Sequence, residues 1–150
     1  MTGRPSYVYV ASSWRNPMQP AVVATLRAAG IDCYDFRNPE AGTGFAWREV
    51  GLEQNAFGEV QQPDYLAALE HPRSIEGFDS DFAAMQRADT FVLVLPCGRS
   101  AHLELGWAVG AGKRTAILLD DPCTPELMYR MVDHLAPSVF DLLGWLGVED

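Results

Sequence analysis

Residues 88–114 read ADTFVLVLPCGRSAHLELGWAVGAGKR, and this stretch carries the clearest structural pattern in the chain. The run Thr90–Leu95 is almost entirely apolar and ends at Pro96. Such a run is typical of a strand that is buried on both faces, as in a parallel sheet covered by helices. The pattern then predicts a helix over 101–110 and another strand over 114–119. Strand, helix and strand in this order indicate a βαβ unit.

The alternation of strands and helices continues on both sides of this unit. Periodicity, β-rich runs and Gly or Pro breaks predict the other elements. Strands are expected over 7–11 and 31–36, a helix from 16–17 to a stop at Gly30, a long segment rich in Gly, Pro, Asn and Gln over 37–62, one or two helical turns over 63–70, helices over 79–88, 126–132 and 138–146, and a short edge strand over 134–136. A long irregular segment inside a small domain is often functional, as a lid or binding loop.

These elements predict an α/β fold. We expect a single doubly wound domain over 1–150, of flavodoxin-like or Rossmann-like type, with a parallel sheet of about four to five strands. Ligands bind such sheets outside the carboxyl ends of the strands. This rule selects the loops that follow Ala11, Phe36, Leu95 and Leu119 as the place for a site.

Composition and charge exclude several classes of function. The chain has 150 residues, 48% of them hydrophobic, which suits a compact domain with a sizeable core. The net charge of -9 argues against nucleic acid as the main partner, because duplex binding draws much of its affinity from basic side chains. A small anionic ligand remains compatible with this charge, since it needs only one local basic patch.

Neither a cofactor nor a membrane partner is expected. The cysteines and the histidines are isolated along the chain, so the sequence shows no spacing typical of metal ligands. No apolar run approaches the roughly 20 residues that span a bilayer. The N-terminal sequence lacks the pattern of a secretory signal, so a cytoplasmic localisation with free thiols is expected.

Glu104 is the leading candidate for chemistry. Its neighbours Leu103, Leu105 and Trp107 are apolar, and no Lys or Arg follows one turn later to pair with it. A carboxylate in an apolar cleft at the carboxyl edge of a parallel sheet suits nucleophilic or acid–base catalysis. Position alone also allows a structural role, in which Ser100 caps the helix and Glu104 interacts with its dipole.

The end of the same helix, GWAVGAGKR, is similar to a phosphate-binding P-loop but lacks its spacing. Trp107 stands where the first glycine of that motif belongs, and Arg114 stands where Ser or Thr belongs. An ATP-binding loop is therefore excluded. Gly106 and Gly110 are interpreted as close-packing positions against a strand or another helix.

Segment 81–114 resembles the core motif of the nucleoside 2-deoxyribosyltransferase family, which includes the related 2'-deoxynucleoside 5'-phosphate N-hydrolases. The matching residues are Asp81, Ala88-Asp89, the strand to Leu95, Glu104-Leu105-Gly106-Trp107-Ala108 and Gly112-Lys113. Upstream, Tyr9-Val-Ala-Ser12 resembles the first-strand motif in which a Tyr hydrogen-bonds the catalytic carboxylate. The resemblance covers most of the chain outside 37–76.

The resemblance implies cleavage of the N-glycosidic bond of a nucleoside or a nucleoside 5'-monophosphate. Glu104 would attack the anomeric carbon and form a glycosyl-enzyme intermediate, while Tyr9 would orient it. Asp81 would contact or protonate the departing base. Water would then complete a hydrolysis, or a second base would complete a transfer. Apart from the resemblance, Tyr9 reads as an ordinary strand aromatic and Asp81 as an acid in the first turn of a helix.

Two positions depart from the family pattern. Gly98 stands where the transferases carry Asp and the nucleotide hydrolases carry a phosphate-contacting Ser, and His102 replaces a Gly. Arg99, Ser100 and the backbone N–H groups at the helix start could together hold a phosphate, which favours a nucleotide. Arg99 could equally be a solvated loop residue, and His102 is either a local proton donor or structural.

The remaining candidate contacts lie in other loops at this sheet edge. Ser12, Trp14 and Arg15 follow the first strand. Trp14 suits stacking on a base, or equally covering the helix beneath, and Arg15 supplies a second cation. Asp35, near the end of the predicted second strand, suits polar contacts to the sugar or base. By the resemblance, Glu126 reaches the site of a neighbouring subunit, and a homo-oligomer is expected.

Two other functions remain open. The first is NAD+ glycohydrolysis, since TIR domains combine a flavodoxin-like sheet with a catalytic Glu, and the spacing of Ser100 and Glu104 is similar to theirs. The sequence from Glu104 to Ala108 fits the deoxyribosyltransferase pattern better. The second is a nucleotide-binding module without catalysis, which the substitutions at Gly98 and His102 keep open.

Overall fold

The computed structural model describes residues 3–40 and 44–149. The chain forms two compact units, Met1–Phe36 with Ala84–Asp150 and Arg37–Ala83. Helix α3 (Pro72–Arg87) begins in the second unit and ends in the first. The single domain predicted over 1–150 stays a prediction. No helix in the described residues is long and apolar enough to cross a membrane.

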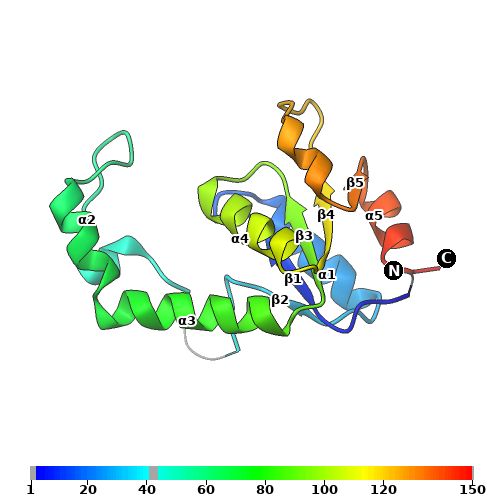
Figure 1. Ribbon diagram of the computed structural model, residues 1–150, viewed down its shortest axis with the longest axis horizontal. Coiled ribbons are helices and arrows are strands. Elements are labelled where there is room, and N and C mark those ends of the chain that lie inside the picture. Colours follow the sequence, from blue (N-terminus) through cyan, green and yellow to red (C-terminus); the bar gives the residue numbers. More distant parts are fainter. Residues whose placement is uncertain (1–2, 41–43, 150) are drawn as a thin grey trace. The chain divides into compact units, whose positions relative to one another are not determined.

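The first unit is built on a five-stranded sheet in the order β2-β1-β3-β4-β5, and every neighbouring pair of strands is parallel (Figure 1). The strands are β1 (Val8–Ala11), β2 (Cys33–Tyr34), β3 (Thr90–Val94), β4 (Arg114–Leu118) and β5 (His134–Ala136). Its helices are α1 (Met18–Ala28), α4 (Arg99–Gly110) and α5 (Val139–Trp145), with a 3-10 helix η2 (Leu127–Met131). The predicted α/β fold with a doubly wound parallel sheet is confirmed.

The two faces of the sheet carry different side chains, because successive residues of a strand point to opposite faces. Val8, Val10 and Val92 join the main hydrophobic cluster, which α1 and α5 complete with Leu26 and Leu142. The residues between them, among them Tyr9 and Phe91, face α4. All residues of β3 are buried, as a strand covered by helices on both faces requires.

Three elements differ from the sequence prediction. The second strand is only two residues long, because only Val8 and Tyr9 of β1 pair with it at the sheet edge. The segment predicted as a helix over 126–132 forms the 3-10 helix η2. Helix α3 begins at Pro72 instead of 79. Proline is tolerated in a first helical turn, and the missing side chain of Gly77 leaves room for the Phe45 side chain, whose Cβ atom lies 3.1 Å from where a Cβ of residue 77 would lie.

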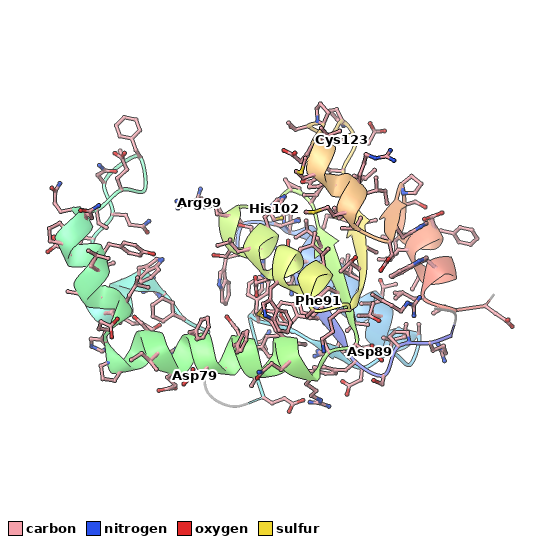
Figure 2. The ribbon with its side chains drawn as sticks, viewed as in Figure 1. Asp79, Asp89, Phe91, Arg99, His102 and Cys123 are labelled. Carbon is pink, nitrogen blue, oxygen red and sulfur yellow. The ribbon has the colours of Figure 1, made fainter. Side chains whose placement is uncertain are left out.

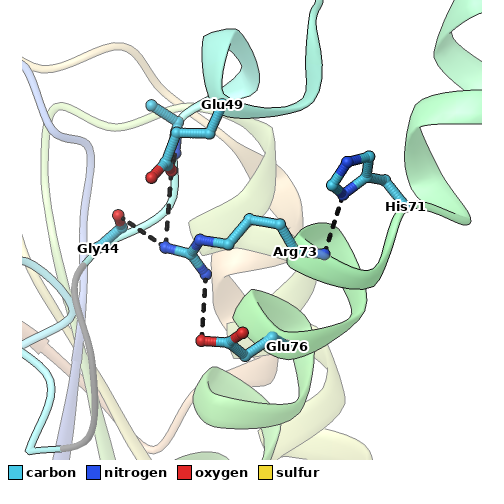
Figure 3. A network of polar contacts seen from close by, with 6 residues as sticks. Gly44, Glu49, His71, Arg73 and Glu76 are labelled. Atoms are coloured by element: carbon cyan, nitrogen blue, oxygen red, sulfur yellow. Dashed lines mark hydrogen bonds and ion pairs between the residues drawn. The ribbon is translucent and has the colours of Figure 1, made fainter.

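The second unit contains η1 (Trp47–Val50), α2 (Gln62–Leu69) and most of α3, so part of the long segment predicted over 37–62 is ordered. Arg73 joins its parts (Figure 3). The Arg73 guanidinium donates to the Gly44 carbonyl at 3.1 Å, pairs with Glu49 at 3.6 Å and with Glu76 at 3.8 Å, and lies 5.6 Å from the centre of the Phe45 ring.

Candidate active site at the carboxyl edge of the sheet

Tyr9 and Glu104 are in direct contact. The Tyr9 hydroxyl, on β1, donates a hydrogen bond to the Oε2 atom of Glu104, on α4. Tyr9 is 1% exposed and Glu104 is half-buried. The two residues lie 95 positions apart in the sequence, and the crossover through β3 brings α4 onto the face of the sheet that carries Tyr9. A phenol bonded to one carboxylate oxygen fixes the orientation of that carboxylate.

The Tyr9 ring is held between two other aromatic rings. In the parallel register Tyr9 pairs with Tyr34 of β2 and with Phe91 of β3. The ring centres lie 5.3 Å and 4.9 Å from that of Tyr9, with interplanar angles of 19° and 23°. Trp107 of α4 lies 6.1 Å from Phe91, which Figure 2 labels. This ladder of rings in register across three strands leaves the Tyr9 hydroxyl little freedom to move.

The apolar surroundings expected for Glu104 are only partly confirmed. Leu105 is buried, but Leu103 is 76% exposed, because successive residues of a helix point in different directions. The carboxylate bonds the hydroxyl of Tyr9, whose ring is stacked with those of Tyr34 and Phe91. The predicted close packing of Gly106 and Gly110 is wrong within the described residues, since a Cβ at either position would meet nothing within 4 Å.

The start of α4 also differs from the prediction. Gly98, not Ser100, is its N-cap residue, and Arg99 and Ser100 form its exposed first turn (Figure 2). No side chain at the N-cap binds the first backbone N–H groups, since glycine has none. A Cβ at Gly98 would meet nothing within 4 Å, so the surface above this helix start is open.

The predicted contacts in the first two loops lie at the same edge of the sheet. The Ser12 hydroxyl donates to the Val94 carbonyl at the end of β3, at 2.9 Å. Trp14 is 52% exposed and its ring lies edge-on, 5.4 Å from that of Phe36. Arg15 is exposed. Asp35 is buried and accepts a hydrogen bond from the Gln19 amide at 2.9 Å.

His102 and Glu126 lie in a different place from the Tyr9–Glu104 pair. They line a groove of about 430 Å³ between α4 and η2, which Glu104 does not line. The Nδ1 atom of His102 donates to the Gly98 carbonyl at 2.7 Å, and its Nε2 atom lies 2.8 Å from the Tyr129 hydroxyl. The Glu126 carboxylate accepts from the Met128 backbone and caps η2. These contacts hold both side chains in the groove, and their contact with a substrate stays a prediction.

Cys97 lies three residues after the end of β3 and is the nucleophilic side chain to weigh against Glu104. Burial, together with the nearby carboxylates of Glu104 and Asp120, raises the pKa of the Cys97 thiol to about 12. The thiol therefore stays protonated at neutral pH and is a poor nucleophile. In the part of the chain that the structure describes, no cluster of three or more His, Cys, Asp or Glu residues could hold a metal ion.

Asp81 belongs to the second unit and is half-buried on α3. Because α3 begins at Pro72, Asp81 lies in the middle of the helix, and the alternative interpretation as a first-turn acid is wrong. Its contact with a departing base stays a prediction.

Sequence reasoning missed four residues that build this edge: Asn16, Tyr34, Phe91 and Tyr129. Tyr34 and Phe91 contact Tyr9 only through the register of three strands, which the sequence does not specify. Tyr129 binds His102 from 27 positions away. Asn16 did carry a signal, since Asn is favoured before a helix start, but its contacts with β3 carried none.

Comparison with solved structures finds several chains with a similar fold. A 2-deoxyribosyltransferase of Bacillus psychrosaccharolyticus matches 91% of this chain and 89% of its own, with a TM-score of 0.54 and 19% identity. A conserved protein of Enterococcus faecalis matches 95% and 97%, with a TM-score of 0.58 and 14% identity. A CMP N-glycosidase of Clostridium botulinum matches 95% and 99%, with a TM-score of 0.47 and 15% identity.

No protein-family model and no curated protein sequence matches the chain at a significant level. At these identities the likeness establishes the fold. The structures similar to this chain thus include a 2-deoxyribosyltransferase, the kind of enzyme whose core motif segment 81–114 resembles.

Proposed function

We propose that this protein cleaves the N-glycosidic bond of a nucleoside or a nucleoside 5'-monophosphate, with Glu104 as the nucleophile. The observation that carries the proposal is the hydrogen bond from the buried Tyr9 hydroxyl to the Glu104 carboxylate at the carboxyl edge of the parallel sheet. Ligands of such sheets bind at this edge. The fold that the chain shares with a 2-deoxyribosyltransferase also supports cleavage of an N-glycosidic bond.

In the first step, a Glu104 oxygen attacks the anomeric carbon of the sugar. A C–O ester bond forms and the C–N bond breaks, and its electron pair leaves with the base, which takes up a proton. In the second step, water or another base attacks the anomeric carbon, the attacking group gives up a proton to replace the one taken up by the first base, and the ester breaks to restore the Glu104 carboxylate. Tyr9 holds the carboxylate toward the sugar in both steps.

Asp81 is proposed as the group that contacts or protonates the departing base. This role rests on the resemblance of segment 81–114 to the family motif and on the spacing from Asp81 to Asp89. A carboxyl group in this role donates its proton to the base as the C–N bond breaks.

The start of α4 is proposed as the binding place of a 5'-phosphate. The helix N-terminus carries partial positive charge and unpaired backbone N–H groups, and both attract anions. Arg99 and Ser100 lie in its exposed first turn, and the absent side chain of Gly98 leaves space above it. Arg15 adds a second exposed cation in the loop after β1. These features favour a nucleotide over a free nucleoside.

Self-association is kept as a prediction. The outer face of α4 exposes Leu103 together with the open surface at Gly106, and η2 exposes Leu127 at 70% and Met131 at 56%. Exposed apolar side chains gathered on neighbouring elements are common at contacts between protein chains. Light scattering of the purified protein checks it, and a monomer at all concentrations would contradict it.

Chromatographic detection of free base tests the proposed function. The purified protein is incubated with ribo- and deoxyribonucleosides, their 5'-monophosphates and NAD+, with and without an added acceptor base. Glu104→Gln keeps the shape of the side chain and the acceptor for Tyr9, and Glu149→Gln, at an exposed position after α5, is the matched control. We expect base release by the wild type and the control, and none by Glu104→Gln.

Each alternative function has its own outcome in this experiment. Release of nicotinamide from NAD+ alone would replace the proposal with an NAD+ glycohydrolase. Nucleotide binding without release of any base would replace it with a binding module. Release that persists in Glu104→Gln would remove Glu104 as the nucleophile.

A further inference from the structure

We propose that Asn16 is a positioning residue that sets the loop after β1 against the loop after β3, and thereby places the start of α4 for substrate binding. The loop geometry rests on the structure alone, and its consequence for substrate binding rests on the proposed function. Asn16 precedes α1 and is 2% exposed, so its amide meets protein atoms and not solvent.

The amide nitrogen of Asn16 connects three separate points. Its Nδ2 atom donates to the Val94 carbonyl at 3.2 Å and to the Pro96 carbonyl at 3.2 Å, and it lies 3.1 Å from the Ser12 hydroxyl oxygen. Ser12 itself donates to Val94 at 2.9 Å. Two side chains of the loop after β1, Ser12 and Asn16, therefore hold the end of β3.

The amide oxygen of Asn16 binds a different element, the start of α1. The Oδ1 atom accepts a hydrogen bond from the backbone N–H of Met18, the first residue of α1, at 2.9 Å. One side chain thus starts α1 with its acceptor and holds the end of β3 with its donors. An amide provides both kinds of group, whereas a carboxylate provides acceptors only.

The carbonyl groups that Asn16 binds lie just before the start of α4 in the chain, so Asn16 affects where that helix start lies. Pro96 is two residues before Gly98, the N-cap of α4, and Arg99 follows directly. On the other side, Arg15 is adjacent to Asn16. Both arginines proposed to face a phosphate are therefore carried by the segments that Asn16 joins. Small displacements of binding groups have large effects on affinity and rate.

Glu104 depends less on this amide, because the Tyr9 hydroxyl and the body of α4 fix its carboxylate. Loss of the Asn16 donors is therefore expected to weaken nucleotide binding more than it slows the chemical step. A role in folding alone would change stability and leave the ratio of KM to kcat unaltered.

Asn16→Asp separates the acceptor role of the Asn16 side chain, toward α1, from its donor role, toward the end of β3. The carboxylate keeps the acceptor for Met18 and loses the donors, and it faces the Val94 and Pro96 carbonyl oxygens with negative charge. Gln86→Glu is the matched control, since it makes the same amide-to-carboxylate change at an exposed position of α3. Ser12→Ala removes the second bond to Val94 and is expected to act in the same direction with a smaller effect.

Two measurements test the proposal on the full chain. Hydrogen exchange reads hydrogen-bonded backbone amides near the Asn16 contacts, those of Asn16 and Gln19 after β1 and of Leu95 after β3, without reference to activity. Calorimetry reads the affinity for a deoxyribonucleoside 5'-monophosphate in the Glu104→Gln background, where turnover is absent. We expect Asn16→Asp to speed exchange at these amides about tenfold and to weaken nucleotide binding about tenfold or more, with β4 protected as in the wild type. The control is expected to change neither.

Wild-type exchange at both loops in Asn16→Asp would overturn the proposal, as would unchanged nucleotide affinity. Equal loss of protection throughout the sheet would reduce Asn16 to a stability residue and overturn it as well. If the wild type releases no base from any substrate, the proposed function fails, while the exchange and affinity measurements still decide the role of Asn16.

Discussion

The hydroxyl of Tyr9 reaches the carboxylate of Glu104 from a ring that cannot turn away from it. Tyr9 is stacked between Tyr34 and Phe91 across three neighbouring strands, and it bonds Glu104 on the helix that covers this face of the sheet. The strand register therefore determines where the carboxylate points. This relationship links the core of the sheet to the proposed chemistry.

Removal of the Tyr9 hydroxyl is expected to slow base release. Tyr9→Phe keeps the stacked ring and deletes only the donor to Glu104, so kcat is expected to fall about 10- to 100-fold with a small change in KM. Steady-state kinetics on the substrate identified by base release gives both constants. Tyr65→Phe, which deletes a hydroxyl from a partly exposed ring in the second unit, serves as the control for the chemical change. Wild-type kcat in Tyr9→Phe would contradict an orienting role.

Phe91 is expected to act through Tyr9. Phe91→Leu opens space beside the Tyr9 ring, and it is expected to lower stability by about 1–3 kcal/mol and kcat by several-fold. If the loss of rate arises from Tyr9, the same substitution has no further effect on kcat in Tyr9→Phe. A double-mutant cycle measures this coupling. Additive losses of rate in the double variant would show that Phe91 acts independently of Tyr9.

Arg99 is expected to discriminate nucleotides from nucleosides. Arg99→Ala removes a charged donor beside the start of α4, so KM for a 5'-monophosphate is expected to rise about tenfold or more, with little change for the nucleoside. Arg130→Ala, on η2, changes the net charge equally and is the matched control. Equal effects of Arg99→Ala on both substrates would contradict contact with a phosphate.

The cysteines are expected to differ in their reactivity. Cys123 is exposed, whereas burial raises the pKa of the Cys97 thiol to about 12. Since the thiolate is the reactive form, Cys97 is expected to resist iodoacetamide at pH 8 and to become more reactive as the pH rises toward its pKa. Peptide mapping after timed alkylation reads both sites. Alkylation of Cys97 as fast as that of Cys123 would contradict a protonated, buried thiol.

The sequence predicted those features that depend on local pattern. The run Thr90–Leu95 indicates a covered strand by its composition alone, and the structure confirms β3 as buried throughout. The alternation of elements on both sides predicted the parallel sheet, including β5 at its edge. Glu104 could be selected as a catalytic candidate from the sequence because it lies on the helix that follows this strand.

Features that depend on register or on distant contacts were not predictable. The stacking of Tyr9 on Phe91 requires the alignment of β1 with β3, and the donors of Asn16 reach residues about 80 positions away. The length of α3 was missed because Pro72 and Gly77 disfavour a helix locally, while Phe45 packs against the space at Gly77. In the structural interpretation of this segment Ser100 caps α4, but the N-cap residue is Gly98, two positions earlier.

The most direct test of Glu104 as the nucleophile is the detection of a glycosyl group on its side chain. The wild type is mixed with the substrate that releases base, quenched in acid within the time of one turnover, digested and mapped by mass spectrometry. We expect a sugar adduct on the peptide that contains Glu104, and no adduct when Glu104→Gln is treated in the same way. An adduct on another residue, or base release at the wild-type rate by Glu104→Gln, would contradict it.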